Sequence, residues 1–272
     1  VGEVFGPPEN IVRYYGGEAA DGLHLAFNFP LVRIFTDRWR AGHIRKRVDQ
    51  FEGALPKTCW PNYVLGNHDV DRFASRLDSD GLGQARARVG AMLLLTLRGT
   101  PFVYYGEEIG MENVEIPEHM LQDPARFYAR GRDPERTPMQ WTPAGGFTRG
   151  EKTWLPYGDL SVNVEDQSAD PNSLLSLYRR LIWFRRSSKA LTHGNYAPVD
   201  PVPEGVYAYT RTHAGERGEE RLLVALNFTN GDLTFDLPED LTPTETIIST
   251  HTDPPASRTL SLAPNEGRLL RL

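Results

Sequence analysis

Carboxyl and imidazole groups follow short apolar runs at two places in the chain. Tyr63–Leu65 leads into Asn67-His68-Asp69, and Glu3 stands between Gly2 and Val4. Glycoside hydrolysis needs one carboxyl group kept protonated by apolar surroundings beside another kept ionised by hydrogen bonds. Glu3 has the apolar neighbours, and Asp69 has the polar ones. The sequence therefore predicts an enzyme site built from carboxylates at the ends of strands.

Each of these motifs also has an ordinary structural interpretation. A single Gly-Glu pair occurs by chance in many proteins, and Asn-His-Asp can form a turn held by side-chain hydrogen bonds. Glu107 and Glu108 can simply cap a following helix. No His and Cys residues have zinc-site spacing, and Gly81-Leu82-Gly83 lacks the rest of a phosphate-binding fingerprint. We therefore expect neither a metal nor a cofactor.

The elements that position these groups follow an α/β pattern. Up to about Leu191, short apolar runs alternate with helical patterns, which is typical of βα units around a parallel sheet. Active groups in such folds follow the carboxyl ends of the strands. We expect strands at 23–27, 63–65 and 101–105, and helices at 35–51 and 85–97.

A long segment from 110 to 166 interrupts this pattern. It is rich in Pro, Gly, Arg and Trp. A loop of this length within a compact domain is usually functional or disordered. Its arginines and tryptophans favour an ordered loop near a cleft. After it, Asp170 as cap and Pro171 in the first turn predict a helix with an apolar stripe from Leu174 to Phe184.

The pattern of residue types changes after residue 191. Short strand-like runs at 206–210, 222–226, 233–235 and 268–272 are separated by Gly, Pro, Asp and Asn. This spacing predicts a small antiparallel β-sandwich. We therefore divide the chain into an α/β part, 1–191, and a C-terminal β-sandwich domain, 192–272.

Composition excludes several classes of partner. The net charge of −6 argues against nucleic acid, and no apolar run is long enough to span a bilayer. The stretch Arg38–Arg47 is locally basic, but its spacing fits a solvated helix face better than a phosphate site. Cys59 is the single cysteine, which excludes an internal disulfide and favours the cytoplasm. The preference for arginine over lysine favours a GC-rich bacterial source.

Taken in order, the motifs resemble glycoside hydrolase family 13, the α-amylase superfamily, and within it the α-glucosidase and oligo-1,6-glucosidase group. The resemblance covers essentially the whole chain. Segments that resemble known parts of the family are Val1–Val4 (end of barrel strand five), 23–30 (strand six), Asn67–Asp69 (strand seven), 99–111 (strand eight) and 131–141 (the long eighth loop). The resemblance implies the C-terminal part of a (β/α)8 TIM barrel, strands five to eight, followed by the β-sandwich.

The resemblance also implies residue roles. Glu3 corresponds to the general acid/base and Asp69 to the transition-state stabiliser. His68, Arg72 and Arg132 correspond to residues that bind the sugar. The implied substrate is an α-linked glucose oligosaccharide or glucoside, cleaved from its end by a retaining enzyme.

One part of the family pattern is missing. Family members carry a nucleophilic aspartate in an Arg-x-Asp context after strand four, and no such motif follows a strand here. We therefore expect a C-terminal half that is inactive alone and needs an N-terminal half or a homo-oligomer partner. The alternative is a non-catalytic relative used for carbohydrate binding or assembly, with aromatic residues of the long loop stacking on sugars: Trp141, Phe147, Trp154 and Tyr157.

Overall fold

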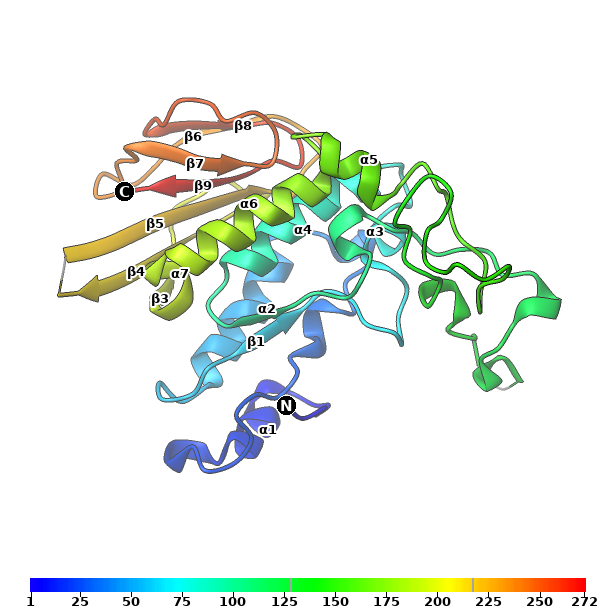
Figure 1. Cartoon of the computed structure of the whole chain (residues 1–272). Coiled ribbons are helices and arrows are strands. Elements are labelled where there is room, and N and C mark those ends of the chain that lie inside the picture. The colour runs from blue at the N-terminus through cyan, green and yellow to red at the C-terminus, as the bar shows by residue number, and fades with distance from the viewer. Residues whose placement is uncertain (128, 217) are drawn as a thin grey trace.

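The computed structural model describes residues 1–127, 129–216 and 218–272. The C-terminal strands lie at one end of the molecule and the N-terminal segment at the other, with helices α4 (Gly83–Thr96) and α6 (Leu174–Ser187) between them (Figure 1). Within these described ranges, no helix is both long and apolar enough to cross a membrane.

A short parallel strand pair marks the α/β part. β1 (Asn62–Val64) pairs with β2 (Thr100–Phe102) in parallel, and Gly2 forms a parallel bridge with Ala26. The predicted strand at 23–27 is therefore reduced to one bridging residue, Ala26, whose backbone N–H donates to the Tyr15 hydroxyl at 3.1 Å. The strand predicted at 101–105 ends at Phe102.

The early end of β2 has a local cause. The backbone N–H of Tyr104 donates to Glu107 Oε2 at 2.8 Å, which turns the chain away from the strand direction. Glu107 therefore does not cap the following helix with its side chain, as one interpretation of the sequence allowed. Its carboxylate instead caps the end of the strand.

The helices match the periodicity with shifted ends. The helix predicted at 35–51 is α2 (Ala41–Ala54), which begins late because Thr36–Arg38 forms a separate 3-10 turn, and the helix predicted at 85–97 is α4. The other helices are α1 (Pro8–Ile11), α3 (Phe73–Arg76), α5 (Val164–Ala169) and α7 (Lys189–His193), and the 3-10 turns are η1 (Val12–Tyr15), η2 (Gly17–Ala19), η3 (Phe29–Leu31), η4 (Thr36–Arg38), η5 (Glu107–Ile109), η6 (Glu118–Met120), η7 (Pro124–Phe127) and η8 (Asp133–Glu135).

The predicted cap of α6 is wrong by three residues. Asp170 follows α5, where its side chain accepts from the N–H of Asn172 in a local turn. Ser173 caps α6 instead, by accepting from the N–H of Ser176 at 3.1 Å. A serine hydroxyl and an aspartate carboxylate are equally good caps, so residue type alone does not distinguish Asp170 from Ser173.

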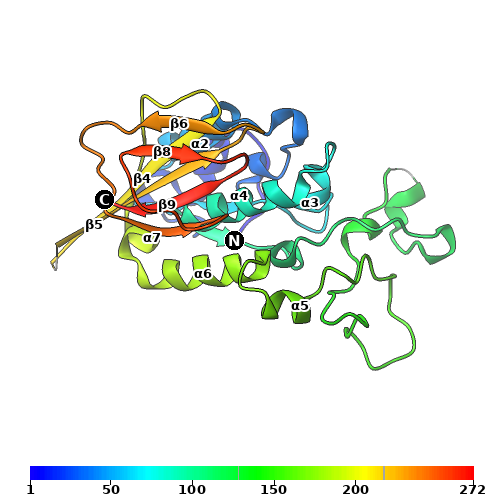
Figure 2. The same ribbon diagram turned by 90° about the horizontal axis from the view of Figure 1, so that it is seen from above.

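The C-terminal part forms two layers of antiparallel strands. A five-stranded sheet has the order β3-β4-β5-β9-β7, and β6 pairs with β8 beside it (Figure 2). Tyr207 and Tyr209 on one face share a core with Leu93 of α4, while Ala208 and Leu223 on the other face pack against strands β6 and β8. The bounds are β3 (Asn195–Pro198), β4 (Val206–Gly215), β5 (Gly218–Asn227), β6 (Leu233–Asp236), β7 (Glu245–Ser249), β8 (Thr259–Leu262) and β9 (Gly267–Arg271).

The long loop is the least compact part of the chain. In both views the segment from about 110 to 160 extends away from the body beyond α3 and α5 (Figures 1 and 2). It contains three short 3-10 turns, η6 to η8, and no strand among its described residues. Hydrogen bonds from its arginine side chains connect it to the turn after β1.

Candidate functional site

The Asn67-His68-Asp69 turn follows β1 and is held from beneath by a buried arginine. Arg76 of α3 donates to the carbonyls of Leu65 and Asp71, each at 2.6 Å, and to that of Ile34 at 3.1 Å. The first two carbonyls bracket the turn on both sides. Burial lowers the pKa of Arg76 to about 10, so it remains a cation at neutral pH. Arg76 therefore fixes the position from which His68 and Asp69 project.

Asp69 is tied to the long loop through a single carboxylate oxygen. Its Oδ1 atom accepts from Arg132 Nη1 at 2.7 Å and from Arg136 Nη2 at 3.2 Å, and lies 3.5 Å from His68 Nε2. In the described part of the chain, no hydrogen bond reaches Asp69 Oδ2. Two arginines thus orient the carboxylate, and its second oxygen stays available to a ligand.

Arg132 is itself fixed within the loop. Its Nε atom and backbone N–H both donate to Asp123 Oδ2, at 2.7 and 2.8 Å, and its Nη2 atom donates to Asp123 Oδ1. The guanidinium group holds the pKa of Asp123 well below its usual range. The buried carboxylate of Asp133 in turn accepts from the backbone N–H groups of Gln122 and Asp123. The arginine that reaches Asp69 is therefore pre-oriented.

Sequence analysis missed Arg136 and Asp123. Arg136 donates from Nε to the carbonyl of His68 at 2.8 Å and also reaches Asp69, so it spans the turn. It lies four residues after Arg132 in the same segment, and this spacing was the available signal. No sequence signal pointed to Asp123, because it lies in a stretch without helical or strand periodicity.

Arg72 has a different environment from the other predicted sugar contacts. It is only 3% exposed, and it donates to the carbonyls of Tyr105 at 2.8 Å and Thr137 at 3.4 Å. Its guanidinium carbon lies 4.8 Å from the ring centre of Tyr105 and 5.4 Å from that of Tyr104. Through its Nη1 and Nη2 groups, Arg72 thus joins the segment after β2 to the long loop.

Glu3 lies apart from this network. It is exposed, beside the Gly2–Ala26 bridge, and within the described ranges no hydrogen bond or ion pair links it to Asp69 or the loop. The structure brings His68, Asp69 and Arg132 together at one turn. Arg72 lies behind that turn, and Glu3 belongs to a different segment, next to the Gly2–Ala26 bridge.

A second carboxyl group is buried beneath the site. Glu107 lies against Gly66, and burial raises its pKa to about 7. Among the described residues, its Oε2 atom accepts from the N–H of Tyr104 and its Oε1 atom has no hydrogen-bond partner. For the residues that the structure describes, no group of three or more His, Cys, Asp or Glu side chains is placed to hold a metal ion.

Known proteins match this chain in sequence and fold. The α-amylase catalytic domain family matches residues 1–194. Maltase A1 of Drosophila melanogaster is 33% identical over 84% of this chain and 40% of its own length. Oligo-1,6-glucosidase of Bacillus cereus is 29% identical over 92% of this chain and 50% of its own.

Solved structures of known proteins also resemble this chain in fold. Trehalulose synthase MutB from Pseudomonas mesoacidophila covers 99% of this chain and superposes with a TM-score of 0.81 at 30% identity. Isomaltulose synthase from Klebsiella sp. covers 99% with a TM-score of 0.84 at 30% identity. In both cases the match spans 55% of the longer chain, so this sequence covers about half the length of its relatives. The motif order, the fold and the family match together show that the chain belongs to the α-amylase family, glycoside hydrolase family 13.

Proposed function

We propose that this chain supplies the acid/base and the charge-stabilising half of a retaining α-glucoside hydrolase. In this proposal, residues 1–191 form barrel strands five to eight, and residues 192–272 form the C-terminal β-sandwich domain. The observation that carries the proposal is the carboxylate of Asp69, held by Arg132 and Arg136 through one oxygen and open at the other. A fixed, half-satisfied carboxylate can accept hydrogen bonds from a sugar and stabilise positive charge at its anomeric carbon.

The residues divide the reaction between them. Glu3 donates a proton to the glycosidic oxygen as the bond breaks, then accepts a proton from the attacking water. Asp69 stabilises the oxocarbenium-like transition state. His68 and Arg132 contact the sugar hydroxyls. Arg72 holds the loop against the strand end, so its effect on substrate binding is indirect.

A carboxylate nucleophile must come from outside this chain. A retaining mechanism places the nucleophile about 5–5.5 Å from the acid. The resemblance puts it after strand four, so we propose that a preceding barrel half, or another copy in a homo-oligomer, completes the site. By itself the chain is then inactive.

The substrate we propose is a short α-linked glucose oligosaccharide or glucoside, cleaved from its end. Two relatives bear names of this class, maltase and oligo-1,6-glucosidase. The long loop that reaches Asp69 through Arg132 supports an end-acting pocket, because it brings side chains over the strand end. We also propose a cytoplasmic location, which the single, buried and free Cys59 supports.

Complementation tests this function. The chain is coexpressed with the N-terminal half of the Bacillus cereus oligo-1,6-glucosidase, and the purified complex is assayed with maltose and with p-nitrophenyl α-glucoside. Asp69→Asn should reduce turnover of both by at least about 10²-fold. Glu3→Gln should affect maltose far more, because p-nitrophenolate leaves without a proton. Glu9→Gln, an exposed carboxylate on α1, is the matched control and should change little.

Two outcomes would contradict the proposal. An assembled complex, seen as one species on size exclusion, that fails to hydrolyse either substrate would do so. So would variants of Glu3 and Asp69 that behave like Glu9→Gln. Maltose binding without turnover, lost in Trp141→Ala but not in Glu3→Gln, would favour the carbohydrate-binding alternative, since Trp141 is 48% exposed.

A further inference from the structure

A small cavity lies beside the Asp69 turn. Gly66, Arg72 and Glu107 contribute to its lining, together with apolar residues of α3 and α4 and the segment after β2. Its volume is about 10 Å³, which is about the least in which one water molecule fits. The cavity is therefore far too small for a sugar, and any ligand in it must be of the size of water.

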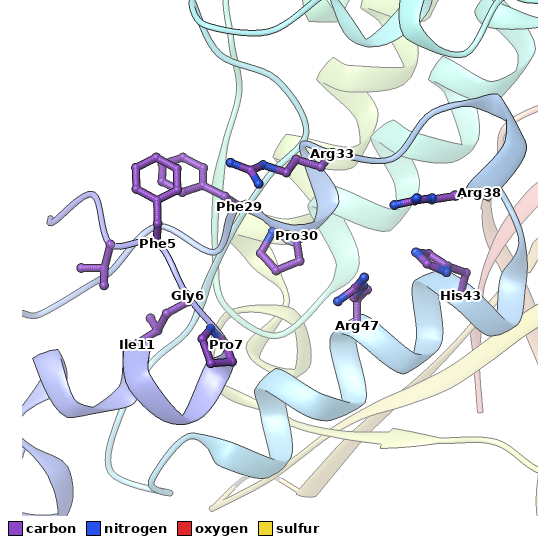
Figure 3. A pocket seen from close by; sticks show the side chains of 11 residues that line it. Phe5, Gly6, Pro7, Ile11, Phe29, Pro30, Arg33, Arg38, His43 and Arg47 are labelled. Carbon is purple, nitrogen blue, oxygen red and sulfur yellow. The ribbon is translucent and has the colours of Figure 1, made fainter.

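This cavity is distinct from the wide hollow between the N-terminal segment and α2, which measures about 470 Å³. Figure 3 shows Phe5, Phe29 and Arg33 among the side chains that line that hollow. Phe5 follows Glu3 by two residues, so the hollow belongs with the proposed hydrolytic site. Among the described residues none lines both spaces, so the two are separate.

Two side chains that line the small cavity each carry a buried polar atom without a partner. Among the described residues, neither Glu107 Oε1 nor Arg72 Nε has a hydrogen bond. The other atoms of both groups are occupied. Glu107 Oε2 accepts from the N–H of Tyr104, and the Nη atoms of Arg72 donate to the carbonyls of Tyr105 and Thr137. Because an unpartnered buried polar atom is costly, both atoms call for a partner in the cavity.

Water suits both atoms chemically. Arg72 Nε can only donate, whereas Glu107 Oε1 accepts when the carboxyl group is ionised and can donate when it is protonated. Burial raises the pKa of Glu107 to about 7, so both forms occur near neutral pH. A water molecule accepts from the arginine and can either donate to or accept from the carboxyl group. A cation would be repelled by the guanidinium group, and an anion by the ionised carboxylate.

We propose that this cavity binds one ordered water molecule, which bridges Arg72 Nε and Glu107 Oε1. The bridge closes a ring of hydrogen bonds, since Arg72 also holds the carbonyl of Tyr105 and Glu107 holds the N–H of Tyr104. It thereby ties the chain on both sides of the Asp69 turn to the segment after β2. The inference concerns the support of the turn and does not depend on the proposed hydrolysis.

Gly66→Ala tests the bridge, because a dry cavity and a hydrated one predict opposite signs. Gly66 does not have a left-handed backbone, and among the described residues the nearest atom to an added Cβ would be Glu107 Oε1 at 3.8 Å. The methyl group therefore fits without a clash. In a dry cavity it would stabilise the fold by filling space and by restricting the unfolded chain. If it displaces a bound water, both polar atoms lose their partner, and the equilibrium constant for unfolding should rise at least about tenfold.

Gly53→Ala on α2 is the matched control, since an added Cβ there meets no described atom within 4 Å. It should lower the equilibrium constant for unfolding, because alanine favours a helix over glycine. Urea denaturation of the full chain and of both variants measures these changes. A Gly66→Ala variant that is stabilised, as Gly53→Ala is, would overturn the proposal.

A crystal structure of the full chain at about 1.5 Å resolution tests the bridge without any substitution. It should show one ordered water molecule at roughly 2.7 to 3.2 Å from both Arg72 Nε and Glu107 Oε1. A direct hydrogen bond between the two side chains, or a cavity without electron density for a water molecule, would contradict the proposal.

Discussion

The C-terminal sheet and the parallel strand pair are held together by different kinds of hydrogen bond. β4 and β5 pair along their full ten residues, from Val206–Asn227 to Gly215–Gly218, and β9 extends this ladder. β1 and β2 pair over only three residues each. The sheet is therefore stabilised by backbone ladders, whereas the region that carries Asp69 has few of them.

Buried arginines take over that role around the parallel pair. Arg76 donates to three carbonyls, two of which bracket the Asp69 turn, and Arg185 donates to those of Leu95, Leu97 and Gly99 at the end of α4 and just beyond it. Arg211 of β4 reaches back to three more, at the ends of α4 and α7. Side chains can satisfy carbonyls where no strand is available. Single side chains therefore maintain the local order near the site, which makes this region more sensitive to substitution than the sheet.

The largest expected effect is on Arg211, which joins the two regions. Its side chain is fully buried and donates to the carbonyls of Thr96, Leu191 and Gly194 at 2.7 to 3.0 Å. Arg211→Met leaves these carbonyls unsatisfied and should lower the free energy of unfolding by about 4 kcal/mol. Urea denaturation measures this. Arg221→Gln, which removes an exposed ion pair with Asp240, should lower the free energy of unfolding by less than about 0.5 kcal/mol. Equal losses in the two variants would show that the buried arginine contributes no more to stability than an exposed one.

Arg76→Met should have the second-largest effect. It should lower the free energy of unfolding by about 3 kcal/mol, because it leaves the carbonyls on both sides of the Asp69 turn without their donor. The stability loss should be accompanied by faster amide hydrogen exchange at 66–71, while exchange in β5 stays unchanged. Exchange that rises equally in both places would mean that Arg76 supports the whole fold and not this turn.

Glu107 should make stability depend on pH. Burial raises its folded pKa to about 7 from an ordinary 4.5, so between these values the folded state keeps a proton that the unfolded state has lost. Its contribution to stability therefore falls as pH rises from 4.5 to 7. The difference in free energy of unfolding between Glu107→Gln and the natural chain should shift in favour of the variant by roughly 2 to 3 kcal/mol as pH rises from 5 to 8. Urea midpoints at both pH values measure it, and a difference that does not vary with pH would contradict the burial argument.

Arg136→Gln should have the smallest effect on stability, below about 1 kcal/mol, because its side chain is partly exposed. Its effect should fall instead on sugar affinity in the complemented enzyme, since Asp69 would keep only Arg132. Arg149→Gln, elsewhere in the loop and exposed, is the control. A loss of stability without a change in KM would assign Arg136 a structural role alone.

The sequence predicted the elements with strong periodicity and missed those without it. α6 repeats apolar residues at helical spacing, α4 has few polar breaks, and β5 carries a continuous apolar run, so all three were found. β3, β7 and β8 are short and partly exposed and were not predicted, whereas the equally short β6 was predicted from its residues 233–235. Strand ends shifted where a side chain, such as that of Glu107, competed for a backbone donor.

The site was predictable to the extent that its residues lie in short motifs. Asn67–Asp69 and the segment of Arg132 were singled out, and the structure places Asp69 and Arg132 2.7 Å apart. Asp123 and Arg76 were not, because both act through long-range hydrogen bonds that no local pattern encodes. The roles of Glu3, His68, Asp69, Arg72 and Arg132 in catalysis remain predictions.

The most direct test of the central claim is hydrolysis of p-nitrophenyl α-glucoside by the purified chain alone, beside its Asp69→Asn variant. We predict no turnover above that of the variant, because in the proposed mechanism this chain supplies the acid and the stabiliser, and the nucleophile comes from elsewhere. Turnover that disappears in Asp69→Asn would contradict this account, since it would show that these 272 residues already form a complete site.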